Sequence, residues 1–233
     1  MRSPESPRAR RRAAKIETIK EEALALVLED GVASFSVHRL AERLDLTVGA
    51  LYRYFDSVDH LLASLQVDVL CVFDAYFDAV IESTEKKGIS LAVELVWAYM
   101  ALSEIAPERF RLISRFVSSM DPLLNDDAAA QAVEPTMRLF AKVATSLEEA
   151  IHDAELSPGD SMDRALLLWS SVHGLLERQK LGRLQVGLFD VNRLGSNLIQ
   201  TLLVGWGAKR DVVESAMDQR LKQDNLRAIL NKI

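Results

Sequence analysis

The segment FSVHRLAERLDLTVGALYRYF, residues 35–55, constrains the fold more than any other stretch of the chain. Its apolar residues recur at helical spacing in two short groups, and Asp45-Leu46 interrupts them. Ser36 and Thr47 stand where the groups begin, and their hydroxyls suit N-cap positions. The pattern predicts a helix-turn-helix. Its inward-facing scaffold consists of Leu40, Leu44, Leu51 and Phe55.

Composition favours helices along the whole chain. The 233 residues are 49% hydrophobic, with 6 Pro and 10 Gly, and strings of Ala, Leu, Glu and Arg dominate. Helical patterns occupy residues 13–29, 36–44, 47–55, 57–85, 90–105, 107–120, 128–155, 161–182, 191–205 and 209–231. We therefore expect an all-α protein without a sheet, in which a three-helix head that holds the helix-turn-helix precedes a C-terminal helix bundle.

The first twelve residues differ from the rest. They combine Pro, Ser and the basic run RARRR, and they have too little apolar area to form a core. We expect a disordered basic arm over residues 1–12, a DNA-binding head over 13–56 and a helical body over 57–233. The run has two interpretations, a solvated terminus or an arm that follows DNA. The neighbouring helix-turn-helix favours the second.

The net charge of −6 is divided unevenly along the chain. Residues 1–55 hold ten Lys or Arg against eight Asp or Glu, and residues 1–15 hold six against one. A basic end on an acidic body directs nucleic acid toward that end.

Candidate DNA contacts lie on the outer face of the helix-turn-helix. The hydroxyls of Tyr52 and Tyr54 suit phosphates, although both rings are also candidates for packing. Arg53 suits a guanine edge or a phosphate, and Gly49 allows close approach of the DNA backbone. The amides that begin the first motif helix favour a phosphate, but capping alone explains Ser36 equally well. The predicted contacts are Arg10, Arg11, Arg12, Ser36, His38, Thr47, Gly49, Ala50, Tyr52, Arg53 and Tyr54.

Two segments of the body, 165–176 and 194–208, contain no charged residue. Their small residues permit close helix approach, so they either fill the centre of the body or pair with a second subunit. The candidates for this dimer interface are Leu168, Ser171, Leu175, Leu198, Leu202 and Trp206. The residues that either line an apolar ligand pocket or form ordinary core are Trp97, Met100, Phe116, Met137, Phe140, Trp169 and His173. His173 needs a polar partner in its uncharged helix.

Several classes of protein lack support in the sequence. No phosphate loop, GxSxG or HExxH motif occurs, and His and Cys residues lack metal-ligand spacing, so we expect no enzyme, metal or cofactor. Cys71 is the single cysteine. Charges interrupt the apolar segments, and we expect a cytoplasmic protein that does not span a membrane. The alternatives are a helical interaction protein without a specific DNA site and, less favoured, an all-helical enzyme.

The chain resembles the TetR family of bacterial transcriptional regulators over roughly residues 13–62. The residues that carry the resemblance are Gly31, Phe35-Ser36-Val37, Leu40-Ala41, Leu46-Thr47, Gly49, Leu51-Tyr52, Tyr54-Phe55 and Leu61-Leu62. The body is similar to one branch of the family, with a Trp-His-Gly C-terminal domain. That similarity rests on Trp169, His173 and Gly174 and on the segment Ala106-Pro107-Glu108-Arg109-Phe110-Arg111-Leu112.

The resemblance implies a homodimer whose heads enter successive major grooves of double-stranded operator DNA. It implies that the uncharged helices form the dimer interface, and that an apolar or amphipathic small molecule in the body, residues 57–233, releases the operator. The chain would then be a repressor. Val48 and Val58 stand where the family often has Lys, so we expect affinity to depend more on Thr47, Arg53, Tyr54 and the RARRR run.

Overall fold

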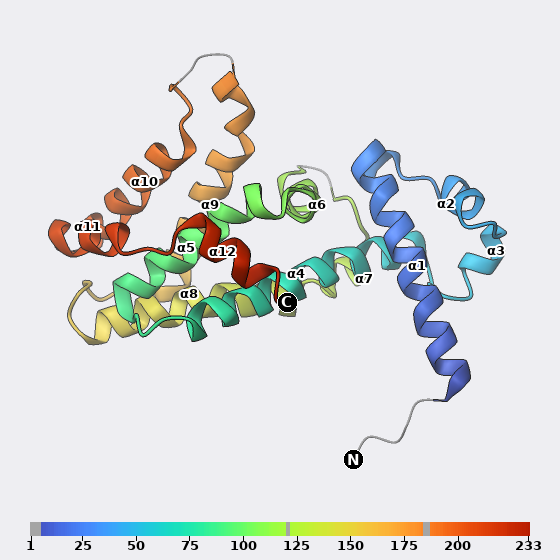
Figure 1. Ribbon diagram of the computed structural model, residues 1–233, viewed down its shortest axis with the longest axis horizontal. Helices are drawn as coiled ribbons and strands as arrows, with labels where there is room; N and C mark the ends of the chain where they lie inside the picture. The colour runs from blue at the N-terminus through green and yellow to red at the C-terminus, as the bar shows by residue number, and fades with distance from the viewer. Residues whose placement is uncertain (1–5, 120–121, 184–186) are drawn as a thin grey trace. The chain divides into compact units, whose positions relative to one another are not determined.

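A computed structural model describes residues 6–119, 122–183 and 187–233, and the described residues form helices joined by turns and loops (Figure 1). The chain divides into two compact units. Unit 1 comprises residues 1–70 and 108–134, and unit 2 comprises residues 71–107 and 135–233. Because each unit consists of two separate stretches of sequence, the two units cannot be divided at a single position in the chain.

The three-helix head lies in unit 1 and consists of α1 (Pro7–Asp30), α2 (Val37–Arg43) and α3 (Val48–Leu51), with a short 3-10 helix, η1 (Val32–Ser34), after α1. The inner face of α1 is fully buried at Ile19 and Ala23, and α2 packs against it. Gly31 ends α1 with φ of 91°, a conformation that favours glycine. The spacing of apolar residues thus produces the expected head.

Unit 1 also includes the first part of α4 (Val58–Glu82), most of α6 (Pro107–Ser118) and α7 (Asp126–Ala130). The hydroxyl of Ser57 accepts a hydrogen bond from the amide of His60 at 3.1 Å and so caps α4. Asp59 accepts hydrogen bonds from the amide and the side chain of Asn125, and Nε2 of His60 lies 3.0 Å from the carboxylate of Asp127. Polar contacts therefore tie the start of α4 to the start of α7.

Unit 2 is built around α5 (Gly88–Ile105), which packs against α9, α11 and α12. The buried apolar residues of α5 include Ile89, Leu95 and Leu102. The other elements are α8 (Val133–His152), α9 (Ser161–Glu177), η2 (Gln179–Arg183), α10 (Val191–Gly205), α11 (Arg210–Asp218) and α12 (Gln223–Leu230). The length and apolar composition of α5 would allow it to span a membrane. However, 72% of the helix window is buried inside the protein, as is typical of a core helix.

The basic run does not form the disordered arm that we predicted. Helix α1 begins at Pro7, and Ser6 caps it by accepting a hydrogen bond from the amide of Ala9. Proline suits the first position of a helix, because its missing N–H has no partner there. Residues 7–12 are therefore helical, and residues 1–5 lie outside the described residues.

Several predicted helices are shorter than expected. The second motif helix ends at Leu51, although the amides of Tyr54 and Phe55 still bond to its carbonyl, and α4 ends at Glu82. The predicted helix 128–155 is divided, because Pro135 lacks an N–H and suits the first turn of α8. The helix over 161–182 ends at Glu177, that over 107–120 ends at Ser118, and Met120 is not described.

Candidate functional site

The recognition surface of the head centres on α3 and the turn that follows it. The hydroxyl of Thr47 accepts a hydrogen bond from the amide of Ala50 at 3.2 Å and so caps α3. Leu51 faces the core, whereas Gly49 and Arg53 are exposed and Tyr52 is 47% exposed. On this short helix, the predicted scaffold residue Leu51 thus lies on the side opposite the exposed residues, whereas the scaffold residues Leu44 and Phe55 lie outside α3 and are half-buried.

Arg12 brings the basic run to the recognition surface. Its guanidinium donates a hydrogen bond to the carbonyl oxygen of Arg53 at 3.4 Å. The same guanidinium lies over the ring of Tyr54, 5.8 Å from the centroid, in a cation–π contact. Tyr54 is half-buried, so its ring packs while part of it stays accessible. Residues far apart in the sequence therefore form one surface.

The two arginines of α2 contact acidic side chains of α1. Arg39 forms ion pairs with Glu29 and Asp30, and Arg43 forms ion pairs with Glu22 and Glu29. The hydrogen bond between Arg43 and Glu29 lowers the pKa of Glu29 and raises the pKa of Arg43. Both arginines of α2 are thus paired locally, whereas Arg53 and the arginines of α1 are exposed and can attract an anion.

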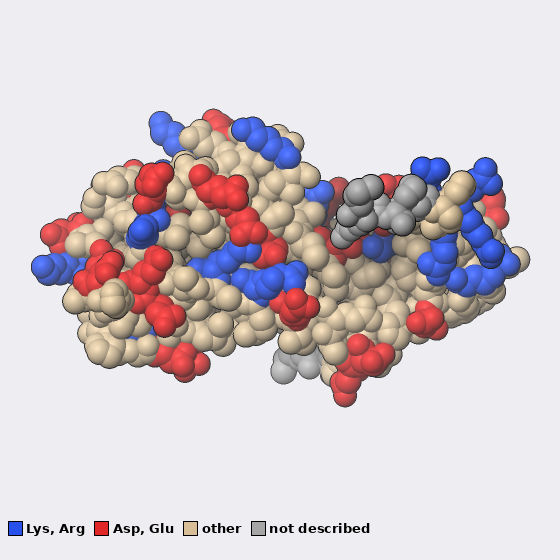
Figure 2. Space-filling model, turned by 90° about the horizontal axis from the view of Figure 1, so that it is seen from below, with Lys and Arg blue, Asp and Glu red and all other residues tan. Residues whose placement is uncertain are grey.

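The helical conformation of α1 divides its arginines between two faces. Successive residues of an α-helix are rotated by about 100°, so Arg8, Arg11 and Arg12 share one face, and Arg10 lies on the opposite face. All four residues are exposed. Since Arg12 contacts Tyr54, the shared face is the one that continues the recognition surface. Figure 2 shows Lys and Arg side chains gathered on unit 1.

The remaining predicted DNA contacts vary in exposure. A Cβ atom added at Gly49 would meet no atom within 4 Å, so this position is open. Ala50 is only 8% exposed, and its burial in the head corrects the prediction that it contacts DNA. Ser36 caps α2 through a hydrogen bond from the amide of Arg39, whereas His38 is exposed. Val48 and Val58 are half-buried.

The predicted pocket residues belong to separate groups. Trp97 and Met100 line a cavity in unit 2. The ring of Trp169 stacks on that of His173 and meets the edge of Phe140, both at a centroid distance of 5.3 Å. Met137 is 42% exposed, and Phe116 lies on α6 in unit 1. The seven residues therefore do not line one common cavity within a single unit.

His173 has the polar partner that its position requires. The hydroxyl of Tyr99 lies 2.8 Å from Nδ1 of His173, and Nε2 lies 3.8 Å from the carboxylate of Glu177. Burial lowers the pKa of His173, which keeps the imidazole neutral at neutral pH. These contacts join α5 to α9.

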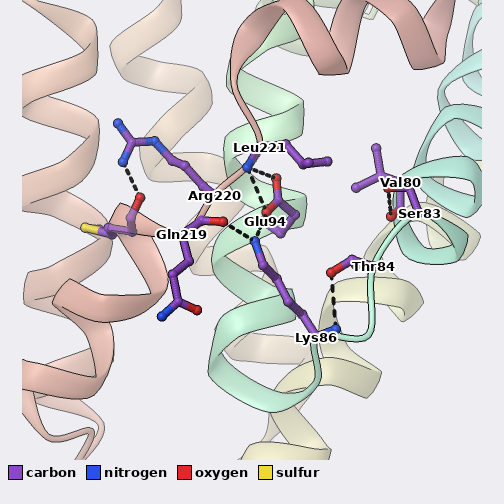
Figure 3. A network of polar contacts seen from close by, with 9 residues as sticks. Val80, Ser83, Thr84, Lys86, Glu94, Gln219, Arg220 and Leu221 are labelled. Carbon is purple, nitrogen blue, oxygen red and sulfur yellow. Dashed lines mark hydrogen bonds and ion pairs between the residues drawn. The ribbon is translucent and has the colours of Figure 1, made fainter.

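A buried charge cluster in unit 2 escaped the sequence analysis (Figure 3). Glu94 on α5 is 0% exposed and pairs with Lys86, which also donates a hydrogen bond to the carbonyl of Gln219 at 2.7 Å. Both carboxylate oxygens of Glu94 accept from the amide of Leu221 at 3.1 Å. The only sequence signal was one acidic residue inside the apolar run Leu91–Met100.

The candidate dimer residues lie on α9 and α10, which pack against each other, except Trp206, which follows the end of α10. Leu168 is only 1% exposed in the core of its own subunit, which corrects its assignment to an interface. The preceding residue, Leu167, is 53% exposed. The residues that remain half-buried and accessible are Ser171, Leu175, Leu198, Leu202 and Trp206.

Comparisons with known proteins place both parts of the chain in one family. The model described as "Bacterial regulatory proteins, tetR family" matches residues 19–65. The model described as "Tetracyclin repressor-like, C-terminal domain" matches residues 93–202, which include Trp169, His173 and Gly174. Together the two models cover more than half of the chain. No curated protein shows significant similarity to it.

Solved structures show the same fold. SCO4313, described as a regulatory protein, is 25% identical over 85% of this chain and 100% of its own, with a TM-score of 0.63. SmeT, the repressor of the Stenotrophomonas maltophilia multidrug efflux pump SmeDEF, is 22% identical over 82% and 89%, with a TM-score of 0.58. RolR in complex with resorcinol is 14% identical over 92% and 98%, with a TM-score of 0.61. The chain belongs to the TetR family and is a DNA-binding transcriptional regulator.

Proposed function

We propose that the protein is a homodimeric, cytoplasmic repressor that binds operator DNA and leaves it when a small molecule binds to unit 2. The observation that carries the DNA-binding surface is the contact of Arg12 with Arg53 and Tyr54, since it joins the exposed arginines of α1 to α3. A continuous basic surface next to a short exposed helix suits a DNA groove and its phosphates.

Two of the structural neighbours motivate the regulatory part of the proposal. SmeT is a repressor, and RolR was solved with resorcinol bound. Both share their fold with this chain. The accessible residues of α9 and α10 supply the proposed contact between the two subunits.

Selection of DNA fragments by the purified protein tests the function directly. We expect sequencing of the retained fragments to give a palindromic site, and a gel shift to confirm that a scrambled site competes poorly. Retention without any sequence preference would contradict the proposal and favour the helical interaction protein. An all-helical enzyme would instead convert a co-purified ligand, which mass spectrometry before and after incubation detects.

Arginines on the two faces of α1 are expected to respond differently to salt. Arg8→Gln and Arg11→Gln should each lower the slope of log affinity against log salt by about 0.9, because each removes one phosphate contact. Arg10→Gln is the matched control: the sequence analysis also names Arg10 as a DNA contact, but its position on the opposite face of α1 predicts an unchanged slope. Fluorescence anisotropy with the selected operator measures all three slopes. An equal change for the three variants would contradict the assignment of a DNA-facing side.

Replacing Gly49 by alanine is expected to change the stability of the protein and its affinity for the operator in different directions. Gly49→Ala should keep or raise the stability, by up to about 1 kcal/mol, because alanine favours a helix and the position is open. If the DNA backbone approaches this position closely, the added methyl group should weaken operator binding by about tenfold, a cost typical of overpacking. Thermal unfolding and anisotropy on the same sample measure both effects. Unchanged affinity would show that DNA keeps its distance from Gly49.

A further inference from the structure

The cavity of unit 2 that Trp97 and Met100 line is formed by segments far apart in the sequence, and the Trp169 ring cluster is not part of its lining. The cavity lies between the C-terminal half of α5, the start of α10 and the connector between α11 and α12, residues 219–222. Its volume is about 380 Å³, which suits a small organic ligand. Trp97, Met100 and Leu221 supply apolar surface, and Arg220 and Lys222 supply positive charge.

Arg220 is held in place from several sides. Its guanidinium stacks on the indole of Trp97, 4.0 Å from the ring centroid, and donates a hydrogen bond to the carbonyl oxygen of Met217. The guanidinium has more N–H donors than this bond uses. Figure 3 shows its side chain running away from Glu94. A guanidinium fixed on an aromatic face and lining a cavity is a suitable receptor for a carboxylate.

The backbone on both sides of Arg220 is also fixed. The carbonyl of Gln219 accepts a hydrogen bond from Lys86, and the amide of Leu221 donates to Glu94. Because Glu94 is fully buried, these bonds fix the connector to the core of unit 2. The site is thus formed before a ligand arrives, which lowers the entropic cost of binding.

Other charged groups around the cavity affect whether it favours an anion or a cation. Lys222 precedes α12, whose N-terminus has no side-chain cap, so Lys222 and the helix dipole both favour an anion. Glu104 and Asp218 also line the cavity and oppose an anion. The side chain of Gln223 donates a hydrogen bond to Glu104, and Asp218 is exposed to water. The two basic and two acidic groups balance in number, and the guanidinium of Arg220 is fixed against Trp97 in the lining, so we expect an anion to bind there.

We infer that this cavity binds a small monocarboxylate with an apolar body, whose carboxylate pairs with Arg220. The apolar body then contacts Trp97, Met100 and Leu221. The inference rests on the proposed function, because it names the class of effector that unit 2 takes. The ligand joins α5 to the connector, and α6 of unit 1 follows α5 after one residue in the chain.

Calorimetry on the DNA-free protein tests the site with phenylacetate and hexanoate as probes. We expect both acids to bind about tenfold or more tightly than phenylacetamide and hexanamide, which have the same shape without the charge. Arg220→Gln should abolish this difference. Arg227→Gln, an exposed arginine of α12 that does not line the cavity, is the matched control and should leave it unchanged.

A second variant tests the cavity independently, in case Arg220→Gln disturbs folding. Asn192→Trp fills the cavity from an exposed position at the start of α10, without a change of charge, and should block both acids. Thermal unfolding confirms that each variant is folded. The inference is overturned if acids and amides bind alike, if phenethylamine binds more tightly than phenylacetate, if no probe gives a heat of binding at millimolar concentration, or if both cavity variants bind as the original chain does.

Operator binding is measured separately. A bound acid should weaken the complex with the selected operator in the original chain and not in Arg220→Gln. A protein that binds the acids but no specific DNA contradicts the proposed function and leaves the site in place. A protein that binds its operator but neither acid overturns the site alone.

Discussion

Lys86→Met is expected to destabilise unit 2 strongly. The change leaves the carboxylate of Glu94 fully buried, with the amide of Leu221 as its remaining donor among the contacts described above. An uncompensated buried charge costs about 3 to 5 kcal/mol, which corresponds to a fall in Tm of roughly 6 to 20 °C for a domain of this size. Thermal unfolding followed by circular dichroism measures the shift.

The neighbouring lysine supplies the control. Lys87 is exposed, and Lys87→Met should leave the Tm close to that of the original chain, because it removes no buried pair. Adding Glu94→Gln to Lys86→Met should recover part of the lost stability, since the buried group is then neutral. If Lys86→Met and Lys87→Met unfold at the same temperature, the buried pair does not stabilise the protein.

Arg53→Ala is expected to weaken operator binding by roughly 5- to 150-fold, the equivalent of about 1 to 3 kcal/mol for a bidentate contact to a base. Its side chain is exposed beside α3, and the carbonyl of the same residue holds Arg12. Arg53→Lys should give an intermediate affinity, because an ammonium group cannot reproduce the planar fork. Anisotropy with the selected operator measures both variants, and gel filtration checks that the proposed dimer persists.

Two substitutions of Tyr54 distinguish a packing role of its ring from a phosphate contact made by its hydroxyl. Tyr54→Phe keeps the ring under Arg12 and removes the hydroxyl, whereas Tyr54→Ala removes both. If the hydroxyl meets a phosphate, the two variants should lose similar affinity. Arg43→Ala is the control within the head, since this arginine is paired with Glu22 and Glu29. A loss of binding in Arg43→Ala as large as in Arg53→Ala would contradict the proposed surface.

Local chemistry explains why the head was predictable from the sequence. Ser36 and Thr47 cap the helices that they precede, and the apolar spacing places Leu40 and Leu51 in the core. Each of these signals lies within a few residues of its effect. The outer face of α3 follows from the same spacing, so the exposed positions Gly49, Tyr52 and Arg53 were also foreseen.

Contacts between distant residues explain what the sequence did not reveal. The predicted helix 209–231 is interrupted at residues 219–222, because the amide of Leu221 bonds to Glu94 instead of continuing the helix. The pairing of Arg12 with Arg53 spans 41 positions in the chain. No periodic pattern encodes such partners. Leu168 was misplaced for a related reason, since an uncharged helix does not show which of its sides meets its own subunit.

The inclusion of α6 and α7 in unit 1 bears on how regulators of this kind can be recombined. A chimera that joins residues 1–70 to another regulator's body would lose Asn125 and Asp127, the partners of Asp59 and His60. It would also lose Arg115, whose guanidinium nitrogen Nη1 lies 2.6 Å from the position that a Cβ atom on Gly31 would take. A transferable DNA-reading module of this protein therefore consists of two separate pieces of sequence, and a graft should carry residues 108–134 together with the N-terminal piece.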